Sequence, residues 1–231
     1  MRLAEGGRQP GMQTIRGGEV LDDAGVRVWA DCRKVTRLLL VRHAPPDAQW
    51  APERRLCGWF DPPLGEPGVR VAATVAEALA LSGAPALYAS PLRRAWETAV
   101  LIGGPLGLEP SNCDALREIN CGELDGLFLD DVRRRFPDLW RRNVEQTDEH
   151  FRWPGGESYA EFRDRVKTGL DTLAARHTGE TVLVVTHTGV VTQVLGMVHG
   201  WSSARWDRDR PAFGGVTRVS WGSGGPLGFI T

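Results

Sequence analysis

The sequence predicts an α/β fold, a three-layer α/β/α sandwich around a mostly parallel sheet. Two runs rich in Leu and Val, residues 38–41 and 182–185, carry no charge and are typical of strands covered on both faces. Segments with helical periodicity lie around these runs, and this alternation of strands and helices is typical of an α/β sandwich. With 231 residues and 42% hydrophobic content, the chain is expected to form one large domain.

The individual elements follow from local patterns. In chain order, strands are expected at residues 37–42, 86–89, 181–186 and 216–221, and helices at 68–82, from Ser90 to a break at 105–110, at 130–136, 158–177 and 189–198. Apolar residues at 72, 75, 76 and 79 define the buried face of the first helix. Ser90 and Pro91 suit the N-cap and first position of the second, and Ser158 with Glu161 forms a capping box.

Two segments of the chain lack such regular patterns. Residues 44–67 hold six of the 15 prolines and are expected to form a long loop beside the first strand. Residues 1–35 are interpreted as an N-terminal extension, mostly irregular, in which the alternation from Val26 to Ala30 allows one edge strand. We assign this extension no chemistry.

Composition excludes several function classes. The net charge of −1 argues against nucleic-acid binding by bulk electrostatics. The four cysteines show no C-x-x-C spacing, so no metal site is predicted. The N-terminus lacks the apolar core of a signal peptide, and no apolar run reaches the ~18 residues of a membrane span. A cytoplasmic protein without nucleic-acid or membrane partners is expected.

Five charged or titratable residues are placed where they could bind an anion and react with it. His43 and His187 each follow a buried strand, and ligands of α/β sheets bind outside the carboxyl ends of the strands. Metal-free phosphoryl transfer needs a neutral nucleophile such as imidazole, fixed positive charge and an acid for the leaving oxygen. His43 and His187, Arg42 and Arg94, and Glu118 supply these groups. Taken singly, each residue also has a structural explanation, such as a hydrogen-bonded histidine or a surface ion pair.

Five segments, in order, resemble the motifs of the histidine phosphatase superfamily, the phosphoglycerate mutase-like proteins. They are Arg42-His43-Ala44, the segment 58–64, Ser90-Pro91-Leu92-Arg93-Arg94, Leu116-Arg117-Glu118 with Gly122 and Gly126, and Val185-Thr186-His187-Thr188-Gly189. The resemblance covers residues 37–221 and implies a phosphoglycerate mutase-like fold, with a histidine phosphatase domain at 36–231.

The resemblance also implies roles for single residues. His43 would attack phosphorus and become phosphohistidine, and Glu118 would protonate the leaving oxygen and then activate water. His187 is the third catalytic residue, and Arg42, Arg94, Gln49 and Thr188 would bind the phosphoryl group. No metal or organic cofactor is implied. Trp59 and Trp153 are candidate walls of the substrate pocket.

Some positions depart from the family pattern. Ala44 stands where Gly is usual, Gln49 where an Asn phosphate ligand is common, and Gly65 where Thr is common. The short spacing between Glu118 and His187 favours a phosphatase over a mutase, and the segment 151–158 resembles the Pro-Gly-Gly-Glu-Ser segment of small phosphatases, including α-ribazole phosphatases.

The expected function is hydrolysis of a small phosphorylated metabolite. A phosphoglycerate-type mutase and a non-catalytic phospho-ligand-binding module are the alternatives. The sequence leaves the physiological substrate and the oligomeric state open, a dimer included.

Overall fold

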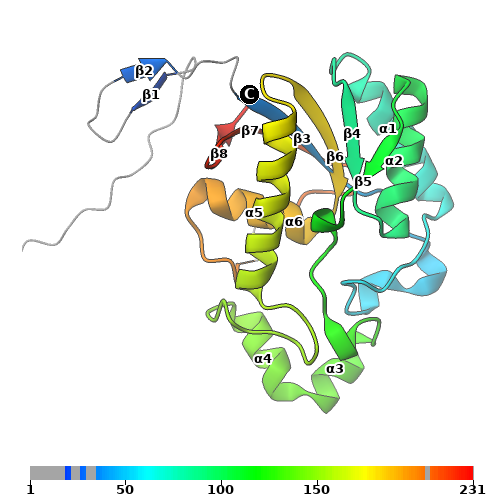
Figure 1. The fold of residues 1–231 in the computed structure, drawn as a ribbon. Helices are drawn as coiled ribbons and strands as arrows, with labels where there is room; N and C mark the ends of the chain where they lie inside the picture. The colour runs from blue at the N-terminus through cyan, green and yellow to red at the C-terminus, as the bar shows by residue number, and fades with distance from the viewer. Residues whose placement is uncertain (1–18, 22–26, 30–34, 206–208, 231) are drawn as a thin grey trace, which may run out of the picture.

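A six-stranded mixed sheet forms the centre of the molecule. The computed structural model describes residues 19–21, 27–29, 35–205 and 209–230. The strands lie in the order β5-β4-β6-β3-β7-β8 (Figure 1). Their bounds are β3 (Thr36–Arg42), β4 (Ala86–Ala89), β5 (Pro110–Asn112), β6 (Thr181–Thr186), β7 (Val216–Gly222) and β8 (Gly225–Phe229). The neighbours β5, β4, β6 and β3 are parallel, and β7 and β8 add an antiparallel edge.

Helices cover both faces of the sheet, which explains why the central strands are uninterrupted apolar runs. Leu38 and Leu40 of β3 pack in one core cluster with α5 (Tyr159–Arg176) and α6 (Thr188–His199). Leu39 and Val41 face the other way and pack with α1 (Glu66–Leu79) and α2 (Arg93–Leu106). Because successive side chains of a strand alternate between faces, both sets must be apolar. The predicted α/β/α sandwich is confirmed.

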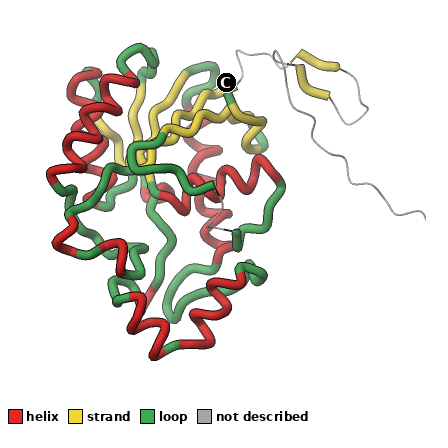
Figure 2. Tube along the Cα trace, turned by 180° about the vertical axis from the view of Figure 1, so that it is seen from behind, coloured by secondary structure: helices red, strands yellow, loops and turns green. Residues whose placement is uncertain are grey.

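Two short helices lie at one end of the sheet. They are α3 (Leu129–Arg135) and α4 (Pro137–Glu145), and both figures of the backbone show them apart from the main layers, joined to them by loops (Figures 1 and 2). A third core cluster, with Phe151, Trp153 and Tyr159, fills the space beneath them. Four short 3-10 helices of the described residues lie in the connecting loops: η2 (Ala48–Trp50), η3 (Pro52–Arg54), η4 (Asp114–Leu116) and η5 (Gly122–Leu124).

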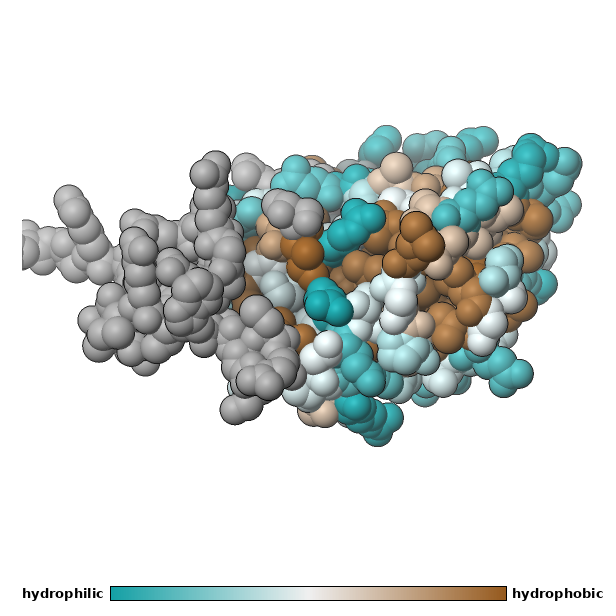
Figure 3. Space-filling view, turned by 90° about the horizontal axis from the view of Figure 1, so that it is seen from above, coloured by the Kyte–Doolittle hydropathy of each residue, from teal (hydrophilic) through white to brown (hydrophobic). Residues whose placement is uncertain are grey.

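The opposite end of the molecule carries apolar surface. In the view from above, brown residues gather on the side of α1 and α2 (Figure 3). Leu81, just after α1, is 98% exposed. None of the helices in the described ranges is long and apolar enough to cross a membrane.

Several predicted boundaries were wrong. Helix α2 begins at Arg93 with Leu92 as its N-cap, so Ser90 and Pro91 precede it. It also continues through Pro105, ending where Gly107 adopts a left-handed φ of 67°. Helix α1 begins at Glu66, two residues before the predicted start. The sequence analysis missed β5, β8 and α4, which lack clear apolar periodicity.

The N-terminal extension contains one described antiparallel pair. Strand β1 (Glu19–Leu21) pairs with β2 (Arg27–Trp29). Residues 27–29 of the expected edge strand form β2, but β2 belongs to a separate two-stranded sheet and is not an edge of the six-stranded sheet. Val26 and Ala30 lie outside the described residues. The division of the chain into an extension at 1–35 and a domain at 36–231 stays a prediction.

Candidate active site

The two strand-end histidines lie beside each other. Strands β3 and β6 are parallel neighbours in which Arg42 pairs with Thr186, and the backbone N–H of His43 donates to the Thr186 carbonyl at 2.8 Å. The residues that follow each strand therefore share one edge of the sheet. The ring centroids of His43 and His187 are 5.1 Å apart. The juxtaposition expected from the sequence is present.

The surroundings of His43 fix its tautomer. Its Nδ1 lies 2.8 Å from the carbonyl oxygen of Ala44. A carbonyl can only accept, so Nδ1 carries the proton and Nε2 holds the lone pair. Burial, with Arg94 and Arg42 close by, holds the pKa of His43 well below its usual value. At neutral pH the imidazole is therefore uncharged and its Nε2 is a nucleophile.

The guanidinium of Arg94 is held by the loop that follows β3. Nη1 donates to the Phe60 carbonyl and Nη2 to the Gly58 carbonyl, both at 2.8 Å, and Nε donates to Nε2 of His43 at 3.3 Å. The side chain is only 2% exposed. A buried cation is costly unless it is hydrogen-bonded or paired, and these carbonyls, with Asp61 Oδ1 at 3.7 Å from Nη1, stabilise the guanidinium next to the nucleophile.

Arg42 supplies a second cation at the same place. Its Nη1 donates to the Pro211 carbonyl at 2.7 Å, and its guanidinium lies 3.7 Å from the ring centroid of Phe213. Burial and the nearby Arg210 lower the pKa of Arg42 to about 10, so it stays charged at neutral pH. Its Nε is buried and has no hydrogen-bond partner among the described residues, which leaves a donor for a bound anion.

Glu118 is fixed at both carboxylate oxygens. Oε1 accepts from the Ile119 backbone N–H at 2.9 Å, and Oε2 accepts from the Gly189 N–H at 3.0 Å. Gly189 is required for this position, because a Cβ there would lie 2.1 Å from Oε1. The Gly of the second-histidine motif therefore makes room for the acid of another motif.

His187 is completely buried at the start of α6. Its Nε2 lies 2.8 Å from Ser90 Oγ, which itself accepts from the Leu92 N–H at 3.3 Å. Because Ser90 Oγ accepts from Leu92, its hydroxyl proton can be donated to Nε2 of His187. The ring proton of His187 is then on Nδ1. That Nδ1 has no partner within the described part of the chain. Burial and Arg94 hold the pKa of His187 well below its usual value.

These groups meet at a cavity of about 510 Å³. Of the residues predicted for the site, Arg42, His43, Arg94, Glu118, Thr188 and Trp153 line it. Trp59 does not line it; its indole Nε1 donates to the Glu118 carbonyl at 2.9 Å. Gln49 is not brought to it either, because its side-chain amide is exposed and donates to Asp47 at 2.7 Å. His187 does not line the cavity; it is completely buried, next to His43 and Ser90.

Sequence reasoning missed several wall residues. The apolar part of the lining comes from separate elements: Leu56, Leu129, Trp140, Tyr159, Phe162 and Phe213. Tyr159 and Phe162 carry a helical core signal, which indicates burial and not a cavity. Phe213 and Pro211 lie in a Gly- and Pro-rich segment, where no periodicity could reveal their contact with Arg42. Within the described residues, no group of three or more His, Cys, Asp or Glu side chains could hold a metal ion.

Comparison with known proteins agrees with this geometry. Residues 38–227 match the histidine phosphatase superfamily (branch 1). Phosphoserine phosphatase 1 of Hydrogenobacter thermophilus is 36% identical over 154 residues, 67% of this chain and 72% of that protein. The metal-independent phosphoserine phosphatase of Arabidopsis thaliana is 32% identical over 173 residues, 74% and 72% of the two chains. Several mycobacterial relatives, 36% identical, are longer, and the chain spans 45% of their length.

Solved structures give the same result. A mycobacterial glucosyl-3-phosphoglycerate phosphatase superposes with a TM-score of 0.72 at 27% identity, covering 82% of this chain and 92% of that one. The α-ribazole phosphatase of Shigella flexneri shares the fold, with a TM-score of 0.73, 20% identity, and coverage of 84% and 95%. The resemblance inferred from the five motifs is confirmed. The chain belongs to the histidine phosphatase superfamily and is an enzyme of the phosphatase class.

Proposed function

We propose that this enzyme is a metal-independent phosphomonoesterase that hydrolyses a small phosphorylated metabolite through a phosphohistidine on His43. The observation that carries the proposal is the state of His43. Its Nδ1–H donates to the Ala44 carbonyl, so Nε2 is unprotonated, and the Nε2 lone pair accepts a long hydrogen bond of 3.3 Å from Arg94 Nε. A neutral nucleophile beside two cations suits attack on a phosphate monoester dianion.

In the first step, Nε2 of His43 attacks phosphorus in line with the leaving oxygen. The N–P bond forms as the P–O bond to the leaving group breaks, and Glu118 in its protonated form gives its proton to the departing oxygen. Arg42 and Arg94 stabilise the charge on the transferring phosphoryl group. His187 does not line the cavity, but its ring centroid is 5.1 Å from that of His43 and its Nδ1 has no partner among the described residues, so we assign its Nδ1–H to an oxygen of the phosphoryl group on His43.

In the second step, water cleaves the phosphohistidine. Glu118, now a carboxylate, takes a proton from the attacking water, the O–P bond forms, and the N–P bond breaks to return neutral His43 and inorganic phosphate. No step requires a metal ion. Two cysteines at the cavity, Cys57 and Cys121, do not compete as nucleophiles, because burial raises the pKa of both thiols and the thiolate is the reactive form.

The substrate is proposed as a class only. The relatives named above act on phosphoserine and glucosyl-3-phosphoglycerate. These two compounds and α-ribazole phosphate are therefore the first candidate substrates to test. Beyond the charged end, the cavity is lined by Trp140, Trp153, Tyr159 and Phe162, which supports a leaving group with substantial carbon surface.

Hydrolysis of p-nitrophenyl phosphate in EDTA tests the proposal. We expect turnover by the wild type and loss of turnover in His43→Ala, with thermal unfolding to verify that the variant is folded. Full activity in His43→Ala, or activity only after a metal ion is added, would contradict the proposal. A requirement for a bisphosphate primer would indicate the mutase alternative, and phosphate binding without turnover the binding module.

A further inference from the structure

The Pro154-Gly155-Gly156-Glu157 segment packs against the backbone that carries Glu118. The N–H of Glu157 donates to the Asn120 carbonyl at 3.0 Å, and the N–H of Asn120 donates to Glu157 Oε2 at 2.9 Å. Gly156 is packed so closely that a Cβ there would lie 2.4 Å from the Asn120 carbonyl oxygen. Asn120 is two residues after Glu118, so this segment holds the chain just beyond the proposed acid.

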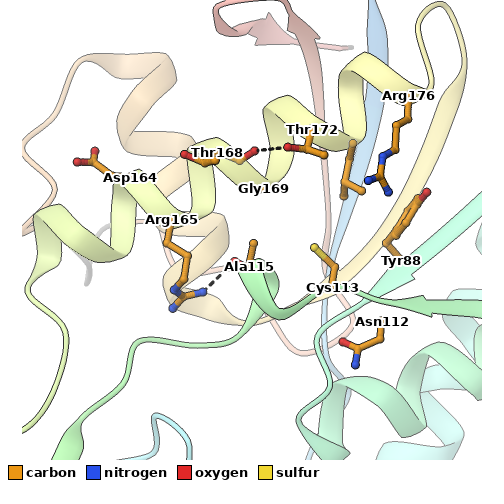
Figure 4. A pocket seen from close by; sticks show the side chains of 11 residues that line it. Tyr88, Asn112, Cys113, Ala115, Asp164, Arg165, Thr168, Gly169, Thr172 and Arg176 are labelled. Atoms are coloured by element: carbon orange, nitrogen blue, oxygen red, sulfur yellow. Dashed lines mark hydrogen bonds between the residues drawn. The ribbon is translucent and has the colours of Figure 1, made fainter.

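Arg165 of α5 holds the chain just before it. One guanidinium reaches three carbonyl groups between residues 115 and 118: Nη1 donates to Ala115 at 2.9 Å and Arg117 at 3.2 Å, and Nη2 donates to Glu118 at 3.2 Å. Figure 4 shows the side chain extending from α5 to Ala115, across one end of a second cavity of about 580 Å³.

Glu157 and Arg165 are joined to each other. The Glu157 carboxylate accepts from Nε of Arg165 at 2.6 Å and from its Nη2 at 2.8 Å, a bidentate pair that is only 20% and 24% exposed. Bidentate, partly buried pairs of this kind have a fixed geometry. The pair therefore connects the two contacts into one support around Glu118, to which Trp59 adds its bond to the same Glu118 carbonyl.

We propose that Arg165 and Glu157 are positioning residues that fix the general acid, an inference that rests on the role proposed for Glu118. Neither residue lines the cavity of the active site, so neither contacts the substrate. Their effect passes through the backbone of residues 115–120. A catalytic group must be held to within about 0.5 Å to be effective. Loss of the Arg165–Glu157 pair should therefore displace Glu118 and slow the reaction, whereas loss of an ordinary surface ion pair should not.

Dependence on the leaving group separates this role from a merely structural one. p-Nitrophenolate leaves without a proton, phenolate leaves less readily, and the alkoxide of benzyl phosphate needs protonation. Because kcat/KM reports the first phosphoryl transfer, loss of the acid lowers it more for benzyl phosphate than for p-nitrophenyl phosphate. A lower fraction of folded enzyme would instead lower kcat/KM equally for p-nitrophenyl, phenyl and benzyl phosphate.

The variants are Arg165→Met and Glu157→Gln, with Arg165→Lys as the conservative change and Arg163→Met as the control. Arg163 lies on the same helix but pairs with Glu149 and Asp164 and not with Glu157. We expect kcat/KM for benzyl phosphate to fall about 10-fold more than that for p-nitrophenyl phosphate in Arg165→Met. The bias should be smaller in Glu157→Gln and Arg165→Lys, and absent in the control.

Glu118→Gln makes the two possible failures distinguishable. A leaving-group bias in Glu118→Gln and none in Arg165→Met or Glu157→Gln would overturn this inference and leave the proposed function intact. No bias in Glu118→Gln would overturn the acid itself and the inference with it. In the double variant Glu118→Gln/Arg165→Met, the inference predicts no bias beyond that of Glu118→Gln, and a further bias would contradict it.

Discussion

Replacing Gly189 with Ala should displace Glu118 without disrupting the fold. A Cβ at this position would lie 2.1 Å from Oε1 of Glu118, whereas ordinary heavy-atom contacts are about 3.5 Å. The carboxylate is the movable end of a side chain, so it must retreat by about 1 Å or more. A misplacement of about 1 Å can cost about 100-fold in rate, and we expect a loss of that order in kcat/KM for benzyl phosphate.

Stability should change little in this variant. Alanine is favoured over glycine inside a helix by about 0.5–1 kcal/mol, which offsets the pressure of the new methyl group on Phe162, 3.1 Å away. Activity and stability are therefore expected to separate.

Gly196→Ala is the matched control for this prediction. Gly196 lies on the same helix, and the nearest atom to an added Cβ, Cβ of Trp201, is 3.9 Å away. This variant should keep the activity of the wild type and gain about 0.5–1 kcal/mol in unfolding free energy. Steady-state kinetics and urea denaturation of both variants provide the comparison. Activity of Gly189→Ala equal to that of the wild type would refute the placement of Glu118.

Two further predictions concern charge. The pKa values of His43 and His187 are held low in the folded protein, whereas the unfolded chain binds these protons near pH 6.5. The unfolding free energy should therefore fall as the pH drops below about 6.5, by up to about 1.4 kcal/mol per histidine and pH unit. Urea denaturation at several pH values measures this dependence. The slope of unfolding free energy against pH should be shallower in His187→Asn, and an unchanged slope would contradict the prediction. Arg94→Lys cannot reproduce the three donor directions of Arg94, so kcat/KM should drop by about 100-fold or more, and a loss below about 3-fold would show that the cation acts only as a point charge.

The sequence predicted the centre of the fold and the charged centre of the site for identifiable physical reasons. An apolar run such as Leu38–Val41 predicts a strand that is buried on both faces, and parallel strands bring the residues that follow them to one edge of the sheet. That argument brings His43 and His187 to the same edge of the sheet, whereas the pairing of β3 with β6 that makes them neighbours depends on tertiary structure. Arg94 and Glu118 were found by motif order, since a buried arginine held by loop carbonyls has no local signature.

Other features depend on tertiary contacts that local patterns do not encode. Gln49 follows the expected spacing, but Asp47 lies two residues away and binds its side chain instead. Serine is a favoured N-cap residue, yet the hydroxyl of Ser90 is hydrogen-bonded to His187 and the helix begins at Arg93. Phe213 approaches Arg42 across 171 positions of sequence, in a segment without periodicity.

Trapping the intermediate tests the central claim most directly. Wild-type enzyme is mixed rapidly with p-nitrophenyl phosphate, quenched in alkali, where phosphohistidine survives, and digested for mass spectrometry; His43→Asn is treated in parallel. The account predicts one acid-labile phosphoryl group on the peptide that contains His43, and none in the variant. A phosphoryl group on another residue, or hydrolysis by His43→Asn at the rate of the wild type, would contradict it.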